Sequence, residues 1–102
     1  MRILSRKALI SFWTRHATSE PSLKNWYKVV RAAGWRSFAD TRRTYSSVDQ
    51  VKVESVNLVT VFNVGGNNDR IVAAIRYNTQ TVYVLRVLTY AEYDKERWKK
   101  QL

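Results

Sequence analysis

Three apolar runs separated by two short breaks, between residues 57 and 89, constrain the fold more than any other part of the sequence. The runs are rich in β-branched and aromatic residues, which favour strands. The breaks, Gly65-Gly66-Asn67-Asn68-Asp69 and Asn78-Thr79-Gln80, contain residues that reach positive φ at little cost. Connections this short join antiparallel neighbours, so the segment predicts a three-stranded antiparallel meander.

Side chains in this meander alternate between the two faces of the sheet. The wholly apolar set of the second run, which predicts contact with a helical layer, is Ile71, Ala73 and Ile75. The opposite face of that run carries Arg70 and Arg76. Strict alternation in the third run groups Val82, Val84, Arg86 and Leu88 on one face. Arg86 either covers apolar surface with its stem or presents a cation to phosphate, and the pattern leaves both interpretations open.

The segments on either side of the meander predict helices and further strands. Arg2-Ile3-Leu4 can pair with the meander as a fourth strand, and residues 48–54 predict a further strand or a lead-in. Apolar stripes at helical spacing are Leu9, Phe12, Trp13 and His16, and then Leu23, Trp26, Tyr27 and Val30. We therefore expect one α+β domain over residues 1–102, with a two-helix hairpin on a four-stranded, mainly antiparallel sheet and a C-terminal helix.

The chain is strongly basic, because 18 Lys and Arg against 8 Asp and Glu give a net charge of +10. Such a surface attracts polyanions, of which nucleic acid is the commonest in a cytosolic protein. The absence of cysteine excludes disulfides and thiolate chemistry. With one histidine, His16, and no His/Asp/Glu cluster at metal-ligand spacing, we expect no metal and no cofactor. No apolar run is long enough to span a bilayer, so we expect a cytoplasmic protein without a membrane partner.

Arginines gather after the second predicted helix. Arg31, Arg36, Arg42 and Arg43 stand against a single acidic residue in this stretch. A solvated helix end has this composition, because cations suit the C-terminal dipole. The overall charge favours the other interpretation, a patch that contacts RNA phosphates.

Two motifs in the C-terminal half resemble a known family. Val61-Phe62-Asn63-Val64-Gly65-Gly66-Asn67 with Arg70, and then Leu88-Thr89-Tyr90-Ala91-Glu92-Tyr93-Asp94-Lys95, are similar to motifs of the HigB-type toxins of bacterial type II toxin–antitoxin systems. These toxins belong to the RelE-like superfamily of messenger-RNA-cleaving toxins. The resemblance extends to residues 3–9, 23–26 and 35–40, so it covers nearly the whole chain. The family usually has a histidine where this chain has Tyr90.

The resemblance implies a RelE-like fold and an mRNA interferase, a metal-independent endoribonuclease that inhibits translation by cutting messenger RNA on translating ribosomes. It also implies a HigA-like antitoxin encoded alongside, and contact with operator DNA only through the toxin–antitoxin complex. Sites in RelE-like toxins are poor in histidine and use Arg, Lys and Tyr. The positions of Arg70 and Arg86 match basic residues of the family.

Metal-free RNA cleavage needs a base for the 2′-hydroxyl proton, an acid for the leaving 5′-oxygen and cations at the phosphate. The candidates are Arg70 and Arg86 for the phosphate, and Tyr90 and Tyr93 for proton transfer or base stacking. A tyrosine ionises near pH 10, so it serves as a base only if neighbouring arginines lower its pKa. The RNA-binding candidates are Arg36, Arg42, Arg43, Asn67, Arg76 and Lys95.

Three residues near the motifs have structural explanations that compete with functional ones. Asn67 suits a turn that needs positive φ. Glu92 completes a capping box with Thr89 at the start of the C-terminal helix. His16 lies on the apolar side of its predicted helix or at its end, where packing is expected.

Two other functions remain compatible with the sequence. A non-catalytic RNA- or ribosome-binding module needs the same charge and arginines but no proton transfer. A basic partner of an acidic protein needs only the charge. New 5′ ends on transcripts distinguish the enzyme from the binding module, and salt-sensitive RNA binding distinguishes both from the protein partner.

Overall fold

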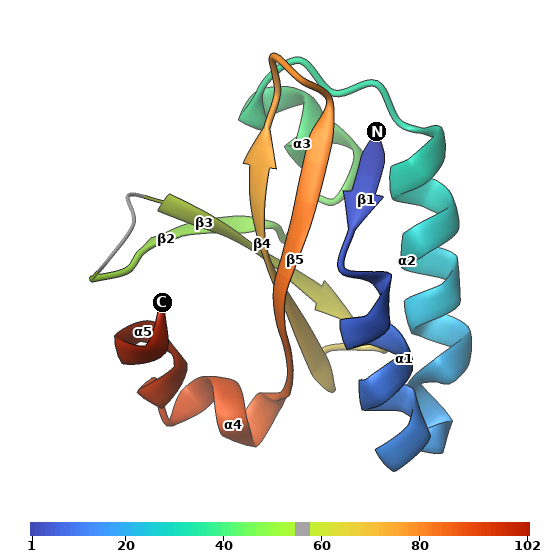
Figure 1. The fold of residues 1–102 in the computed structure, drawn as a ribbon, viewed down its shortest axis with the longest axis vertical. Coiled ribbons are helices and arrows are strands. Elements are labelled where there is room, and N and C mark those ends of the chain that lie inside the picture. Colours follow the sequence, from blue (N-terminus) through green and yellow to red (C-terminus); the bar gives the residue numbers. More distant parts are fainter. Residues whose placement is uncertain (55–57) are drawn as a thin grey trace.

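The computed structural model describes residues 1–54 and 58–102, and it has one central sheet with helices on both faces (Figure 1). The strands are β1 (Arg2–Leu4), β2 (Asp49–Lys52), β3 (Leu58–Val64), β4 (Asp69–Arg76) and β5 (Thr81–Thr89). The helices are α1 (Arg6–Arg15), α2 (Glu20–Ala32), α3 (Phe38–Thr44), α4 (Tyr90–Asp94) and α5 (Arg97–Gln101), with a 3₁₀ turn at Ala17–Ser19. The expected α+β class is confirmed.

The sheet has the strand order β1-β5-β4-β3-β2, in which only β1 runs parallel to its neighbour. The predicted meander is present as β3, β4 and β5, although its predicted first residue, Asn57, lies outside the described residues. The expected count of four strands was wrong. Residues 49–52, inside the segment expected as a strand or a lead-in, pair antiparallel with β3 and make a fifth strand.

A β-bulge in β5 breaks the alternation that the sequence predicts. Ala73 lies opposite Val84, whereas Val72 lies opposite Arg86, so Leu85 is an extra residue between the two pairs. A single extra residue reverses the faces of everything that follows it. The prediction that Val82, Val84, Arg86 and Leu88 share one face is therefore wrong. The two valines pack toward α1 and α2, while Arg86 and Leu88 lie on the opposite face.

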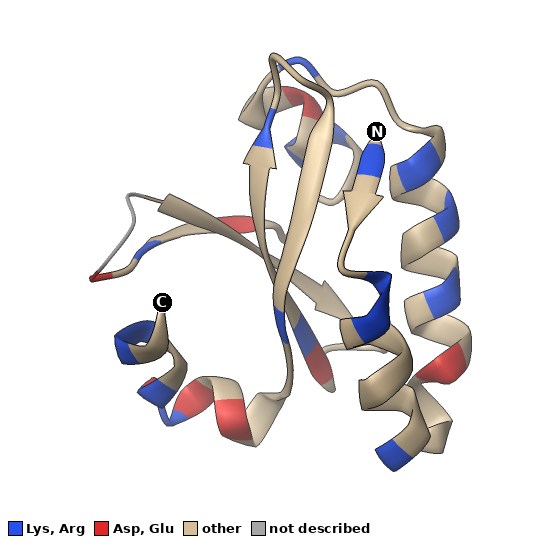
Figure 2. Ribbon diagram, in the orientation of Figure 1, with Lys and Arg blue, Asp and Glu red and all other residues tan. Residues whose placement is uncertain are grey.

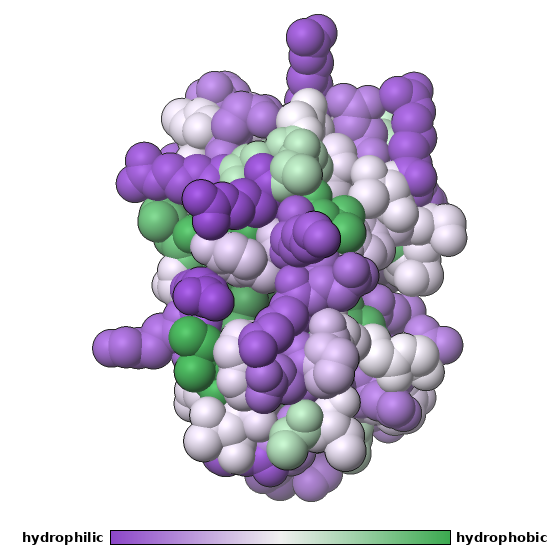
Figure 3. All heavy atoms as spheres, turned by 90° about the vertical axis from the view of Figure 1, so that its right-hand side faces the viewer, coloured by the Kyte–Doolittle hydropathy of each residue, from purple (hydrophilic) through white to green (hydrophobic). Residues whose placement is uncertain are grey.

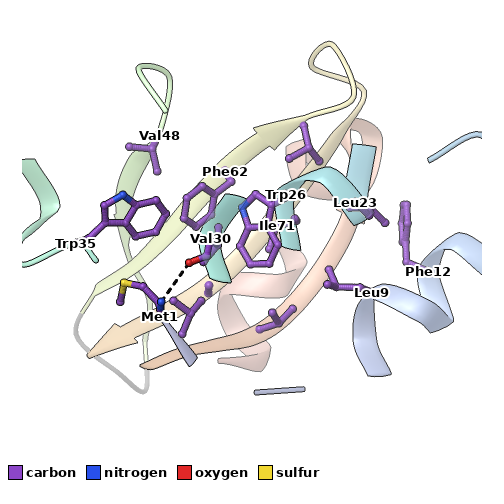
Figure 4. Close-up of a cluster of buried hydrophobic side chains, with 14 residues drawn as sticks. Met1, Leu9, Phe12, Leu23, Trp26, Val30, Trp35, Val48, Phe62 and Ile71 are labelled. Atoms are coloured by element: carbon purple, nitrogen blue, oxygen red, sulfur yellow. Dashed lines mark hydrogen bonds between the residues drawn. The ribbon is translucent and has the colours of Figure 1, made fainter. Parts of the chain in front are cut away.

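The main core fills the space between the sheet and the α1–α2 hairpin (Figure 4). Its buried side chains include Leu9 and Phe12 from α1 and Leu23, Trp26 and Val30 from α2. These are residues of the two predicted stripes, so the hairpin is confirmed. The outer surface of this helical layer is largely hydrophilic (Figure 3).

Phe62 is at the centre of the aromatic part of the main core and has no exposed surface. Its ring lies 5.3 Å from that of Trp26, 6.1 Å from that of Trp35 and 5.4 Å from that of Tyr45, measured between centroids. Three aromatic neighbours from α2, the following loop and the segment after α3 therefore meet on one residue of β3. Phe62 therefore joins α2 and the segments that follow it to the sheet.

The other face of the sheet carries a smaller second core, which the end of the chain covers. It consists of Val53, Val59, Val61, Val72 and Trp98. Trp98, 3% exposed, brings α5 onto the sheet and anchors the C-terminal segment. The expected single C-terminal helix is broken into α4 and α5, because Glu96 has a left-handed backbone with φ of 62°. The candidate site lies at one end of this face, next to α4.

Candidate functional site

The candidate site forms where β4 begins, β5 ends and α4 starts, on the sheet face opposite α1 and α2 (Figure 1). Arg70 lies directly opposite Leu88, and Arg86 lies opposite Val72 on the neighbouring strand. The two arginines are thus diagonal neighbours on one face, a position in which Cβ atoms are typically about 7–8 Å apart or closer. A hydrogen bond of 2.8 Å from the Tyr90 backbone N–H to the Asn68 carbonyl ties α4 to the β3–β4 turn. The fold therefore brings together all four candidate catalytic residues.

Arg70 is held firmly and is only 7% exposed. Its Nη1 donates to the carbonyl oxygens of Asn67 and Asp69 at 2.9 and 3.0 Å. Its guanidinium carbon lies 5.0 Å from the ring centroid of Tyr90 and 5.5 Å from that of Tyr93. Both distances are within the range of cation–π attraction. Arg70 is thus the residue around which the two tyrosines are arranged.

Arg86 has a different setting. It is half-buried, and its Nη1 donates to the carbonyl of Leu85, the bulged residue, at 2.7 Å. Because the bulge turns Arg86 onto the face that carries Arg70, the extra residue is what places both cations on one side of the sheet.

Neither arginine has a carboxylate within salt-bridge distance among residues 1–54 and 58–102. Asp69, the neighbour of Arg70, points toward the helical layer, where its carboxylate accepts a hydrogen bond from Ser19 Oγ at 2.6 Å. A buried cation without a counter-ion is costly to keep, and an incoming anion relieves that cost. The two arginines can therefore bind a negatively charged group such as a phosphodiester.

The two tyrosines differ in environment. Tyr90 is 52% exposed and lies over Arg70 at the surface. Tyr93 is half-buried, and its ring stacks on that of Trp98 at 5.2 Å, while the Trp98 indole N–H donates to the Tyr93 carbonyl at 3.0 Å. Burial raises the pKa of Tyr93, and the opposing charges of Lys99 and Arg70 are the weaker influence. The condition for a tyrosine base, a pKa lowered by arginines, is thus not met at Tyr93, which keeps its proton at neutral pH.

The structural explanations for Glu92 and Asn67 are confirmed. Thr89 and Glu92 form the reciprocal capping box of α4, in which Thr89 Oγ1 accepts from the Glu92 N–H and the Glu92 carboxylate accepts from the Thr89 N–H. Asn67 has a φ of 74°, and its carbonyl accepts from Arg70. Outside the site, His16 caps the end of α1, and its ring stacks on Phe12 at 4.4 Å.

The remaining RNA-binding candidates do not all lie beside the four catalytic candidates. Lys95 follows α4 directly. Arg76 pairs with Thr81 at the other end of β4, near the turn that α3 contacts through Thr41 and Tyr77. At that end Arg36 and Arg42 are exposed, and Arg43 is paired with Asp40 at 2.9 Å. Basic residues therefore lie at both ends of β4 (Figure 2), and strand length separates the two groups by roughly 20 Å.

Sequence reasoning missed the contribution of Trp98 to the site. Trp98 supports Tyr93 by stacking and by a hydrogen bond. The sequence signal for this contact is the spacing of Tyr93 and Trp98, two aromatic residues five positions apart next to a short helix. The described part of the chain contains no group of three His, Asp or Glu residues able to hold a metal ion. Its helices are all too short or too polar to cross a membrane.

Comparison with known proteins places this geometry in context. A family model described as HigB toxin, the RelE-like toxic component of a toxin–antitoxin system, matches residues 19–96. The chain is 26% identical over 95 residues to the mRNA interferase HigB of Escherichia coli strain CFT073, which covers 93% of this chain and 90% of the relative. It is 29% identical over 97 residues to the mRNA interferase toxin HigB of Escherichia coli K12, over 92% of this chain and 88% of the relative. The same identity and coverage hold for the mRNA interferase HigB of Shigella flexneri.

Proposed function

Because the chain belongs to the HigB family of RelE-like toxic components of toxin–antitoxin systems, we propose that it is an mRNA interferase that stops translation by cutting messenger RNA. The observation that carries this proposal is the pair of arginines on one sheet face without a carboxylate partner in the described residues, flanked by two tyrosines. The relatives named as mRNA interferases align with this chain over nearly its whole length, which supports the same assignment.

The proposed reaction is metal-independent and uses the 2′-hydroxyl of the substrate as the nucleophile. Attack of the 2′-oxygen on phosphorus expels the 5′-oxygen and leaves a 2′,3′-cyclic phosphate and a 5′-hydroxyl. Arg70 and Arg86 stabilise the negative charge that builds up on the phosphate oxygens, which is often the largest catalytic contribution. Tyr93, protonated at neutral pH, is suited to donate a proton to the 5′-oxygen. Tyr90, exposed beside Arg70, is the second candidate for proton transfer or for stacking on a base.

The family membership supports further proposals about partners. We assign residues 1–102 to a single toxin domain that acts in the cytoplasm on messenger RNA held by the ribosome. A HigA-like antitoxin neutralises it, and operator DNA is contacted only through that complex. The high positive charge of the chain supports contact with RNA, since phosphate neutralisation supplies most of the non-specific affinity for nucleic acid.

Induction of the chain in a bacterial host, followed by mapping of transcript 5′ ends, tests the proposed function. We expect growth arrest together with new 5′ ends inside coding regions. Growth arrest without new 5′ ends would indicate a non-catalytic RNA- or ribosome-binding module instead of an enzyme. No arrest and no new ends would contradict both.

Tyr90→Phe is expected to lower cleavage by about 10²-fold or more, because the ring and its contact with Arg70 remain while the hydroxyl is lost. Tyr90→His, which introduces the residue that the resembled family usually has, is expected to preserve cleavage. The measurement is the rate at which a reporter transcript acquires its new 5′ end. Cleavage by Tyr90→Phe at the wild-type rate would make Tyr90 a stacking residue.

The pH dependence of cleavage distinguishes the two possible roles of Tyr93. Its folded-state pKa is raised above the usual value near 10, so Tyr93 stays protonated from pH 6 to pH 9. A Tyr93→Phe variant is therefore expected to be slower than wild type by the same factor at every pH in that range. If Tyr93 were instead the base, its ionised fraction would rise about tenfold per pH unit, and the factor would grow accordingly.

A further inference from the structure

Two adjoining hollows lie along the C-terminal segment, on the same sheet face as the candidate site. The larger, of about 430 Å³, is lined by the end of β2 and by α5 and the residues before it. The smaller, of about 230 Å³, lies between β5, α4 and α5. Lys95 and Arg97 line both hollows, so the two adjoin each other, and together they form what we call the C-terminal cleft.

The C-terminal cleft begins at the candidate site. Leu88, which lines the smaller hollow, is the direct strand partner of Arg70. Glu92, on the same helix as Tyr90 and Tyr93, lines the smaller hollow as well. A chain molecule with one unit at the arginines can therefore continue past Leu88, past Lys95 and into the larger hollow.

The lining of the larger hollow is mostly basic. Its cations are Lys52, Lys95, Arg97, Lys99 and Lys100. Its two carboxylates are those of Glu54 and Glu96, and Glu96 is paired with Lys99 at 2.8 Å. Lys52, Lys95, Arg97 and Lys100 have no carboxylate within salt-bridge distance in the described residues. The cleft therefore presents uncompensated cations along its length.

From this arrangement we propose that the C-terminal cleft binds the phosphodiester backbone of single-stranded RNA that flanks the bond cut at the arginines. The inference rests on the proposed function and extends it to the substrate beyond the reacting phosphate. A row of exposed cations next to a phosphate-binding site can contact successive phosphates of a polyanion. Such contacts position the strand and carry no sequence preference of their own.

The test compares two triple variants with the same loss of charge. The cleft variant is Lys52→Gln, Arg97→Gln and Lys100→Gln, and the control variant on the helical layer is Lys7→Gln, Arg15→Gln and Lys28→Gln. All six residues are exposed, so neither variant disturbs the cores. The probe is a fluorescein-labelled RNA of twelve nucleotides with 2′-O-methyl riboses, which binds but has no nucleophile for cleavage. Fluorescence anisotropy at several salt concentrations gives affinity and salt dependence, and cleavage by the wild type is mapped in parallel.

We expect the cleft variant to bind the probe about tenfold more weakly at low salt. The slope of log affinity against log salt should fall by about 2, because each phosphate contact on a single strand contributes about 0.7. The control variant should lose less than about twofold in affinity, since its charges act only at long range.

Equal losses in both variants, or unchanged binding by the cleft variant, would overturn the inference while wild-type cleavage upheld the proposed function. A wild type that neither cuts nor binds RNA would overturn both. A cleft variant that keeps RNA binding and loses binding to polyglutamate would assign the cleft to an acidic protein.

Discussion

Arg86→Ala is expected to abolish the growth arrest caused by induction and to lower RNA cleavage by about 10²–10³-fold, the usual cost of removing one group that stabilises transition-state charge. Arg86 shares its sheet face with Arg70 and has no carboxylate partner in the described residues, so under the proposed function its charge is available to the phosphate. The measurement pairs growth after induction with the yield of new 5′ ends.

Two controls separate loss of chemistry from loss of fold. Arg86 is half-buried, and its only side-chain hydrogen bond in the described residues goes to the adjacent Leu85 carbonyl, so its removal should change the free energy of unfolding by about 1 kcal/mol or less. Arg86→Lys keeps the charge without the planar fork and should give intermediate activity. Arg15→Ala, at an exposed position of α1, should arrest growth as the wild type does. Full toxicity of a folded Arg86→Ala protein would remove Arg86 from the site.

Phe62→Ala is expected to lower the free energy of unfolding by about 3–5 kcal/mol, the range for truncating a fully buried aromatic residue. A domain of this size has a total stability of roughly 5–15 kcal/mol, so the loss is a large share of it. The cavity would open among Trp26, Trp35 and Tyr45, which come from separate elements and have few ways to close it together. Urea unfolding followed by tryptophan fluorescence gives the change in midpoint.

Leu58→Ala provides the matched control, because Leu58 lies on the same strand and is 53% exposed. Its change should stay within about 0.5 kcal/mol. If both variants unfolded at the same urea concentration, Phe62 would not be the centre of the main core. The result also bears on the motif that resembles the family, since Phe62 is part of that motif and yet is fully buried in the main core.

The sequence was sufficient for the features that depend on local patterns. The turn residues at 65–69 and 78–80 set antiparallel pairing, and the stripes through Phe12 and Trp26 set the helical hairpin. The capping box was readable because it needs only Thr89 and Glu92 at fixed spacing. Each of these depends on residues within one or two turns of the chain.

What the sequence did not predict depends on pairing between distant segments. The bulge at Leu85 is determined by how β5 pairs with β4, and no residue type in β5 marks it. Strict alternation therefore grouped Arg86 with Val82 and Val84, from which the bulge separates it. Likewise, the arginines after α2 are far in sequence from the residues of the site. Only the fold shows that they lie at the end of β4 opposite Arg70.

The environment of Tyr93 was also out of reach of the sequence. Neighbouring cations alone suggested a lowered pKa, but burial against Trp98 has the larger effect. The balance between burial and charge depends on how α5 folds back after the left-handed Glu96, a conformation that residue types did not predict.

The position of the tyrosines in the chain has a consequence for when the site exists. Tyr90, Tyr93 and Trp98 belong to residues 90–102, which a ribosome adds after all the other described residues. Synthesis proceeds from the N-terminus at roughly 5–20 residues per second, and the main core requires nothing from this last segment. The main core and Arg70 can thus take their places before either tyrosine packs against Arg70. Under the proposed function, the ribosome that makes the toxin is not exposed to an assembled site until these last residues have been joined.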